Sequence, residues 1–497
     1  MERNVHAALH WPPGSIRTDE PMAAAIDPAP VPAELTGPQP VDAYIRRALA
    51  ENRNVQSARS NVLAMKERIP QVTALDDPMV QNTIWPFPSN GPQYSLMGYG
   101  PYTMMISQQF PWFGTLALRG QAAEQDVKIA LFELATAQLE AVSEVKRSYY
   151  ELYYNQRAEA ILQDNRKLAS DFVEITRARY TTGNTSQQDV LRAEVTVTEL
   201  DRELVTVAQG VAEARAALAQ QLHVSPEADL RTLPEVTIGT VPAEVERLYR
   251  LAVAARPELQ GRLAAVARDE RNVELARKNY YPNIDVGLNY MLMTRENNPS
   301  PLADGRDNFD FTVGFNLPVY RGKLDAGVRE AQARAVADAK RYDADRDRTY
   351  REVKELLAQA RARRDIIELF RTSILPKSEQ ALKVATSDYS TGELEFVSLI
   401  TAWREVLQVQ LQIARMESEL GGTLAQLERV VGCQLNENPP RDAPPPLSAT
   451  EQPPSPPPAD STSPFGNGPG RPKPGGPDAE RTREAEGAAD PPQAQPR

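Results

Sequence analysis

Cysteine and histidine are scarce in this sequence. Among its 497 residues there is one cysteine, Cys433, and there are three histidines, His6, His10 and His223. A single cysteine excludes an intrachain disulfide framework and a cysteine-rich metal site, and three scattered histidines argue against a histidine-built catalytic metal centre. The carboxylates show no paired spacing with a nucleophile, so the sequence predicts no enzyme and no site for a metal or cofactor.

Long apolar runs are also missing. No stretch approaches the roughly 18–20 apolar residues that a membrane-spanning helix needs. Residues 1–21, MERNVHAALHWPPGSIRTDEP, lack the apolar core of a secretory signal. Taken literally, both absences describe a soluble cytoplasmic protein. A membrane β-barrel is compatible with the absence of long apolar runs, because its strands are short and alternate between apolar and polar residues. It would still need a signal for export.

Charge and composition locate the folded part. The net charge of −11 argues against nucleic acid as the main partner. Residues 1–40 are rich in Pro and Ala without periodicity, and residues 438–497 are a Pro-rich mixture of small and charged residues. Neither segment has the apolar content to offset the entropy lost on ordering, so both are predicted to be disordered.

The folded part contains a tandem duplication. Three pairs of segments match in the same order: residues 48–62 with 252–266, 107–125 with 314–332, and 179–191 with 388–400. Three ordered matches indicate two structural repeats, residues 41–240 and 241–437.

Each repeat has the same predicted order of elements. A helix comes first (41–75 and 243–279), followed by a β-hairpin (79–110 and 283–317), a long helix (115–178 and 323–387), a turn (180–185 and 389–393, the tip turns) and a second helix (186–222 and 394–431). Residues 115–178 would span about 96 Å as a helix. Stacked end to end, helices 186–222 and 243–279 would match that length. The pattern predicts a mainly α fold in which long-helix protomers assemble into an α-barrel.

Strict alternation marks the second hairpin as β-strands. One face of these strands carries apolar side chains: Ile284, Val286, Leu288, Tyr290, Phe309, Phe311, Val313 and Phe315. Small and polar residues occupy the other face, which is typical of a barrel with lipid outside and water inside. A soluble hairpin with its apolar face packed on the helices has the same alternation. Aromatic residues at the strand ends, Trp112, Tyr280, Tyr281 and Tyr320, favour a membrane interface.

The first hairpin is less regular. Residues 102–111 alternate acceptably, but residues 79–88 contain two prolines and are expected to form a shorter strand or an edge strand. Four strands per chain cannot close a conducting barrel, and open edges are forbidden in lipid. The chain is therefore expected to oligomerise, and three copies would give a twelve-stranded barrel.

The sequence resembles the TolC-type outer-membrane efflux channels over about residues 41–435. The resemblance is carried by these segments, in order and twice over: "ALAENRNVQSA" and "AVAARPELQ", "FPWFG" and "LPVYRG", "RYTTGNTSQQDVLRAE" and "DYSTGELEFVSLITA", "LAQQLHV" and "LERVVGCQL". It implies a homotrimer in the outer membrane with an α-helical tunnel across the periplasm. The implied partners are a periplasmic adaptor, an inner-membrane efflux transporter and outer-membrane lipid. The "YxTGE" turn looks more like the metal-cation branch, with drug efflux as the alternative.

The resemblance also assigns roles to residues. It implies that the tip turns contact the adaptor through Tyr180, Thr182, Gly183, Asp189, Val190, Leu191, Tyr389, Thr391, Gly392, Ser398 and Leu399. It places Pro111, Gly114, Pro318 and Gly322 at the strand-to-helix junctions. An ordinary helical hairpin explains both tip glycines equally well, since glycine supplies the left-handed conformation that ends a helix.

Two further alternatives remain open. Asp189 either forms a latch with Tyr389 or Arg404, as the resemblance implies, or is an acidic first-turn residue favoured by the helix dipole, with Thr185 or Ser186 as the cap. For the whole chain, the competing hypothesis is a cytosolic or periplasmic coiled-coil scaffold with no transport role.

Overall fold

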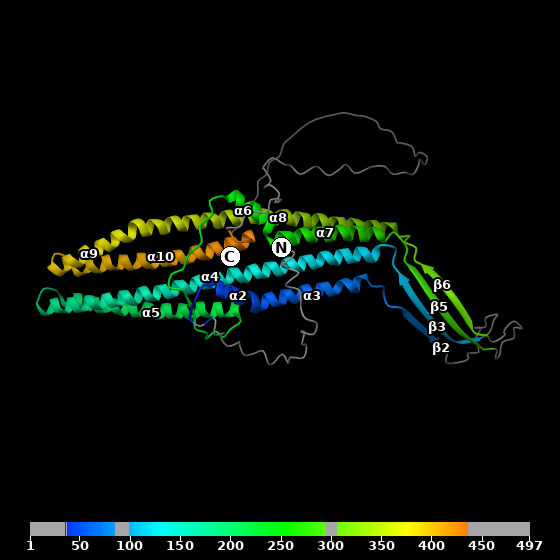
Figure 1. The fold of residues 1–497 in the computed structure, drawn as a ribbon, viewed down its shortest axis with the longest axis horizontal. Coiled ribbons are helices and arrows are strands. Elements are labelled where there is room, and N and C mark those ends of the chain that lie inside the picture. The colour runs from blue at the N-terminus through cyan, green and yellow to red at the C-terminus, as the bar shows by residue number, and fades with distance from the viewer. Residues whose placement is uncertain (1–34, 36, 85–98, 295–305, 436–497) are drawn as a thin grey trace, which may run out of the picture. The chain divides into compact units, whose positions relative to one another are not determined.

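The structure is a computed structural model that describes residue 35 and residues 37–84, 99–294 and 306–435 (Figure 1). All of these lie within residues 1–446, which form one unit. The predictions of disorder for most of 1–40 and for 438–497 lie outside the described residues, as do the centres of both hairpins.

The first helical segment of each repeat is broken near its middle. Residues 41–75 form α2 (Val41–Glu51) and α3 (Arg53–Thr73), and residues 243–279 form α6 (Val245–Ala255) and α7 (Pro257–Lys278). The prediction of one continuous helix in each repeat was wrong. Asn52 is extended and caps α3, because its side chain accepts hydrogen bonds from two backbone amides. Arg256 is extended because it precedes Pro257, whose ring disfavours helical geometry in the preceding residue.

The long helices differ between the repeats. In the first, α4 runs unbroken over Thr115–Thr181; in the second, α8 (Arg321–Leu369) and α9 (Leu375–Thr391) are joined by a π-helical turn, η2 (Phe370–Ile374). Pro376 lies just after that turn. Proline lacks an N–H and its ring clashes with the carbonyl four residues earlier, so a wider turn accommodates it here. After the tip turns come α5 (Gln187–Leu222) and α10 (Phe396–Val431).

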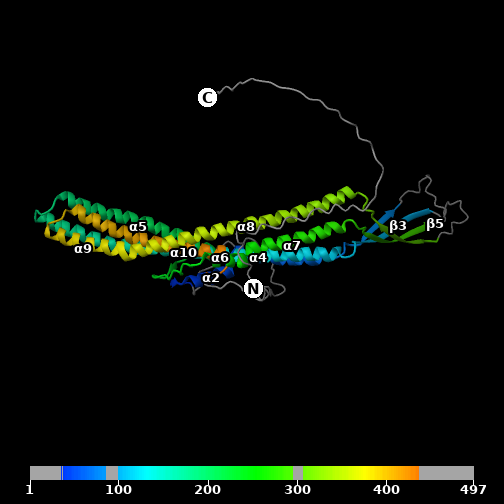
Figure 2. The ribbon, with the colours of Figure 1, turned by 90° about the horizontal axis from the view of Figure 1, so that it is seen from above.

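The short helices stack in a different order from the one predicted. Helix α5 meets α3, where the Asn52 amide donates to the Gln221 carbonyl at 3.2 Å and Arg53 contacts His223 Nε2 at 2.8 Å. Helix α10 meets α7, and a Cβ added at Gly432 would lie 2.7 Å from the Cα of Arg256. The predicted stack of 186–222 on 243–279 was therefore wrong, since each repeat completes its own column (Figures 1 and 2).

Ion pairs join the two repeats where α4 runs beside α10. Arg429 pairs with Glu140 at 2.7 Å and Arg415 with Glu151 at 2.8 Å. Deeper in the same contact, the indole of Trp403, which is 1% exposed, donates to the Asn165 amide oxygen at 3.0 Å. These contacts stabilise the packing of one repeat on the other.

Four antiparallel strands extend from the ends of the helices. The order is β2 (Met79–Ile84), β3 (Tyr99–Phe110), β5 (Ile284–Thr294) and β6 (Asn308–Phe315). As expected, β2 is short and lies at an edge. A second, parallel pair joins β1 (Gly37–Gln39) to β4 (Leu230–Thr232). The prediction of disorder was thus wrong for residues 37–39, whose backbone pairs with a segment far along the chain.

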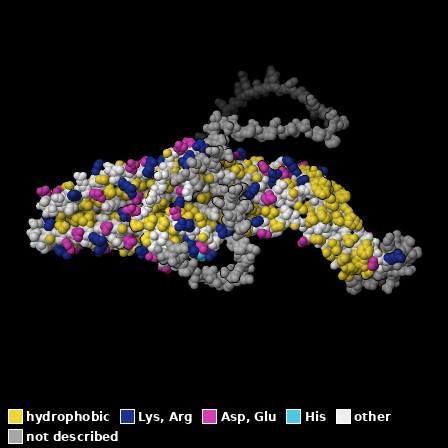
Figure 3. Space-filling view, in the orientation of Figure 1, with side chains coloured by type: hydrophobic (Ala, Val, Ile, Leu, Met, Phe, Trp, Pro, Cys, Tyr) yellow, Lys and Arg dark blue, Asp and Glu magenta, His cyan; other side chains and the backbone are white. Residues whose placement is uncertain are grey.

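The register of the sheet places the predicted apolar side chains on one face. Ile284 lies opposite Phe315, Leu288 opposite Phe311, and Tyr290 opposite Phe309. Directly opposed residues share a face, and here that face is open: Phe309 is 68% and Phe311 71% exposed. The alternative of a hairpin buried against the helices is therefore wrong for this chain. In Figure 3, hydrophobic side chains gather over the strands, while charged side chains spread over the helices. Among the described helices, none combines the length and the apolarity needed to cross a membrane.

Candidate functional site

The tip turns adopt the conformation that glycine favours. Gly183 has a φ of 76° and Gly392 a φ of 91°. The amide of Gly392 donates to the carbonyl of Asp388 at 3.0 Å, and the amide of Asn184 donates to the carbonyl of Arg179 at 2.9 Å. These bonds close the end of the preceding helix in the manner of left-handed helix caps. The role predicted for both glycines in ending the helices is confirmed.

A reciprocal cap starts α5 after the first tip turn. The Asp189 amide donates to the Ser186 hydroxyl at 3.2 Å, and the Ser186 amide donates to the Asp189 carboxylate at 3.3 Å. Thr185 donates a further hydrogen bond to this carboxylate at 2.8 Å. Partial burial raises the pKa of Asp189, but the hydrogen bonds from Thr185 and Ser186 outweigh it and leave that pKa below its usual value.

The latch predicted for Asp189 is wrong within the described protomer. The Tyr389 hydroxyl donates to Thr176 at 3.3 Å, and Arg404 pairs with Glu199 at 2.7 Å. Both proposed latch partners therefore have other contacts, while the Asp189 carboxylate serves the helix cap. The first-turn alternative is the one that the structure supports.

Replacing Asp189 with alanine is expected to destabilise the start of α5 by about 1 kcal/mol, because the capping box is lost. The depressed pKa gives the sign of the pH dependence. The stabilisation is present above the ordinary carboxyl pKa and is lost as the pH falls through the lower folded-state value. Hydrogen exchange of the amides of residues 187–191 measures the effect. Ser398→Ala, at the equivalent position of the second turn, is the control; equal exchange in the two variants would contradict the assignment.

Arg179 joins the two tip turns. Its guanidinium donates to the backbone carbonyls of Tyr389 and Ser390, the latter at 3.1 Å, and to the carbonyl of Asn184 at 3.4 Å. It also lies over the Tyr389 ring, 4.8 Å from the centroid. One side chain thus holds both turns at the same end of the helices, where Figures 1 and 2 place them.

Sequence reasoning missed Arg179. The signal was a charge difference between the duplicated turns, since Asp388 occupies the equivalent position. A residue that differs between otherwise matching turns is a candidate for contacts between them.

Some of the residues predicted to contact an adaptor are exposed and others are buried. Tyr180 and Leu191 are 46% and 53% exposed, whereas Tyr389 and Leu399 are 4% and 1% exposed. The Tyr389 ring packs on Phe396 with centroids 5.6 Å apart. A contact role for the side chains of Tyr389 and Leu399 was therefore wrong, because they belong to the core of the hairpins. The others lie at the surface or are half-buried: Thr182, Gly183, Asp189, Val190, Thr391, Gly392 and Ser398.

The strand-to-helix junctions are only partly equivalent. Gly114 has a φ of 80° and precedes α4 directly. Gly322 lies inside the first turn of α8, which Tyr320 precedes. The chain therefore enters α8 through Tyr320 without a left-handed residue. Pro111 and Pro318 both lie in the irregular segments between strand and helix. The backbone N–H that proline lacks is not needed there for a hydrogen bond between strands.

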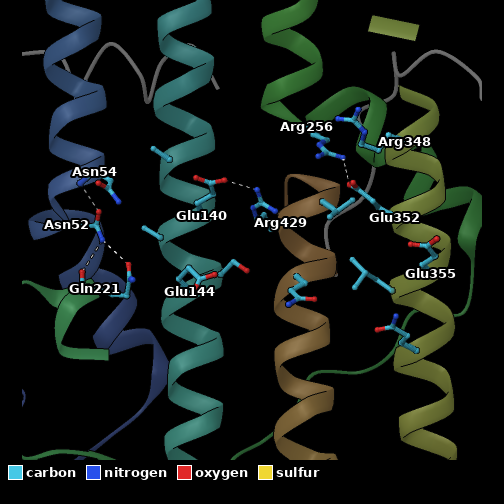
Figure 4. Close-up of a pocket in the computed structure, with 17 residues that line it drawn as sticks. Asn52, Asn54, Glu140, Glu144, Gln221, Arg256, Arg348, Glu352, Glu355 and Arg429 are labelled. Carbon is cyan, nitrogen blue, oxygen red and sulfur yellow. Dashed lines mark hydrogen bonds and ion pairs between the residues drawn. The ribbon is translucent and has the colours of Figure 1, made fainter. Parts of the chain in front are cut away.

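A cavity of about 660 Å³ opens between α4, α10 and α8 (Figure 4). Two ion pairs in its lining join different elements: Arg429 pairs with Glu140 at 2.7 Å, and Arg256 pairs with Glu352 at 3.2 Å. Across the described ranges, no three His, Cys, Asp or Glu side chains are grouped so that they could hold a metal ion.

Comparison with known proteins identifies a family for two long segments of the chain. The family model described as outer membrane efflux protein matches residues 44–222 and 248–433. The cobalt-zinc-cadmium resistance protein CzcC of Cupriavidus metallidurans is 20% identical over 410 residues, covering 81% of this chain and 92% of CzcC. The pyoverdine export outer membrane protein OpmQ of Pseudomonas putida is 23% identical, covering 68% of this chain and 72% of OpmQ.

Solved structures share the fold at low sequence identity. The CusC channel gives a TM-score of 0.68 at 16% identity, with 82% of this chain and 98% of CusC covered. The open state of the MtrE outer membrane channel of Neisseria gonorrhoeae gives 0.65 at 18% identity, with 80% and 89% covered.

Proposed function

Because the chain belongs to the outer membrane efflux protein family, we propose that it works as a homotrimer forming the exit duct of a three-part efflux pump. It is an efflux protein of the outer membrane, and the coiled-coil scaffold hypothesis has no support. Members of this family are channels rather than enzymes. Transport then depends on a continuous passage and on docking surfaces, and substrate moves through without chemical change.

The observation that carries the proposal is the sheet with one open apolar face and two free edges. Strands β2 and β6 are the outer strands of the four. Unpaired strand edges in hydrocarbon leave backbone groups unsatisfied at a cost of several kcal/mol each. Pairing β6 of one copy with β2 of the next removes both edges. Three copies give twelve strands, with the row of Phe309 and Phe311 facing lipid.

The proposed partners dock at the other end of the helices. The tip turns of three chains supply six turns, which suits a periplasmic adaptor that presents repeated copies of one surface. The exposed residues Tyr180 and Leu191 are candidate contacts, and Arg179 fixes the spacing between the two turns of each chain. The adaptor would connect the channel to an inner-membrane transporter.

The proposed substrate class is divalent metal cations. The support is the likeness to a cobalt-zinc-cadmium resistance protein over 81% of this chain. The alternative is a drug or another small molecule, as the relatives named for multidrug resistance suggest.

Deleting the gene is expected to sensitise cells to Co²⁺, Zn²⁺ or Cd²⁺, with resistance restored by the full chain. Growth inhibition and intracellular metal content measure this. Sensitivity to drugs with unchanged metal resistance would support the alternative substrate class. Unchanged resistance to both, together with a soluble protein instead of oligomers in the outer membrane fraction, would contradict the channel itself.

A further inference from the structure

Aromatic rings gather where the sheet ends and the helices begin. Trp112 stacks on Tyr281 with ring centroids 5.1 Å apart and planes 10° from parallel. Tyr281 and Tyr320 are 48% and 78% exposed. Tyr280 lies beside them in the segment between α7 and β5. These four rings come from the ends of three different strands, so the tertiary structure brings them to one level of the molecule.

Two cations are held at the same level by these rings. The Lys278 ammonium lies 5.8 Å from the centroid of Tyr281, and the Arg321 guanidinium lies 5.6 Å from the centroid of Tyr280. Cation–aromatic contacts of this kind position a charge without neutralising it. We call Trp112, Tyr280, Tyr281, Tyr320, Lys278 and Arg321 the junction belt.

The two cations of the junction belt are not paired directly with acidic side chains. Within the described part of the chain, neither Lys278 nor Arg321 forms an ion pair with a carboxylate. The nearby acid Asp325 accepts a hydrogen bond from the Tyr280 hydroxyl. Neither α4 nor α8 has an acidic residue in its first turn, although acidic residues are favoured there. Lys323 in the first turn of α8 adds a further positive charge.

The open apolar face of the sheet continues directly into the belt. The last row of the register before the helices pairs Phe110 with Ile284 and Ile284 with Phe315. Phe315 is 62% exposed, and Leu317, which follows it, is 68% exposed. An occupant of this surface therefore meets apolar side chains along the strands and a positive charge at their end.

We propose that the junction belt binds the phosphate of anionic phospholipids whose acyl chains lie along the apolar face. This inference rests on the proposed function, because it requires the sheet to be in a membrane. An anionic phospholipid has a negatively charged headgroup joined to hydrocarbon chains. The headgroup would meet the cations of the junction belt, and the chains would lie along the apolar face of the strands. Aromatic rings are favoured at the level of lipid headgroups, and an exposed Lys or Arg near the membrane surface attracts anionic lipid.

The test uses the full chain reconstituted into vesicles containing equal amounts of phosphatidylglycerol and phosphatidylcholine. After mild extraction, native mass spectrometry gives the ratio of the two lipids retained by the protein. The wild type is expected to retain phosphatidylglycerol preferentially. Lys278→Gln and Arg321→Gln are each expected to lower this preference about fivefold, because each cation near a surface contributes about 1 kcal/mol, or about fivefold in affinity.

The controls are the single variants Lys340→Gln and Arg364→Gln, each of which removes one positive charge from an exposed position farther along α8. Both are expected to retain the wild-type lipid ratio. An unchanged ratio in the belt variants, or no preference in the wild type, overturns the lipid inference while the channel proposal stands. Failure of the wild type to insert into the mixed vesicles overturns both the lipid inference and the channel proposal.

Discussion

Replacing both Gly183 and Gly392 with valine is expected to abolish efflux while leaving the chain oligomeric in the outer membrane. Both residues have positive φ values, 76° and 91°, and a β-branched residue is strongly disfavoured there. The strain is about 1–3 kcal/mol at each turn, small enough for the rest of the fold to persist. The turns would instead change shape, and the surface proposed for adaptor docking would be lost.

The two positions are expected to differ in severity. A Cβ at Gly183 meets no atom within 4 Å, whereas a Cβ at Gly392 lies 3.3 Å from Arg179 Nη2. Gly392→Val should therefore also disturb the link that Arg179 makes between the turns. Metal sensitivity of complemented cells measures efflux of the proposed metal substrate, and heat-resistant oligomers in the outer membrane fraction show that assembly is intact.

Asparagine at the same positions is the matched control, since it tolerates the left-handed conformation. Efflux is expected to survive Gly183→Asn, which adds bulk but keeps the turn. Loss of efflux in both the valine and the asparagine variants would mean that bulk at the surface, and not turn geometry, is what matters. Normal efflux in the double valine variant would contradict a functional role for the tip turns.

Replacing Arg268 with methionine is expected to destabilise the protein by about 3 kcal/mol, because it leaves the buried carboxylate of Asp269 without its cation and removes one of the two cations at Asp338. Arg268 pairs with carboxylates on three helices: Asp269 at 2.9 Å, Asp338 at 3.3 Å and Asp126 at 3.6 Å. The side chains of Asp269 and Asp338 are only 8% and 9% exposed. The expected destabilisation is at the lower end of the range for breaking a buried ion pair, because Asp338 keeps its ion pair with Arg341 at 2.6 Å.

Arg334→Met is the control for this prediction. Arg334 lies on α8 close to the same cluster, but its side chain is 74% exposed and its partner Glu330 61% exposed. An exposed pair of this kind is worth less than about 1 kcal/mol. Guanidinium unfolding of the detergent-solubilised protein compares the two variants. Adding Asp269→Asn to Arg268→Met should recover part of the loss. Equal stability of the two arginine variants would rule out the buried network as a stabilising element.

Local patterns predicted the elements whose causes are local. The strict alternation of residues 284–290 and 309–315 predicted both the strands and the shared apolar face, because side chains on a strand alternate with a period of two. The Gly in each tip turn predicted where the long helices end, because few residues other than glycine accept a positive φ. Pro257 stood in the sequence as a signal for the break before α7, but the helical periodicity on both sides concealed it.

Contacts between segments that are far apart in the chain could not be predicted from the sequence. The resemblance implied a latch between Asp189 and Tyr389 or Arg404, but in the structure Tyr389 contacts Thr176 and Arg404 pairs with Glu199. The resemblance implied an adaptor contact for Leu399, yet its side chain packs in the core between the hairpins at 1% exposure. Which face of a helix is covered depends on neighbours that are not adjacent in sequence.

The sequence by itself determined the long helices, the tip turns and the apolar alternation of the strands. Each of these follows from backbone preference or side-chain period within one segment. Only the tertiary structure decided that α5 stacks on α3 and α10 on α7, that Arg179 joins the two tip turns, and that Lys278 and Arg321 meet aromatic rings at the end of the sheet. These are pairings between segments far apart in the chain, and they are selected by the packing of whole helices and by the charges that the packing brings together.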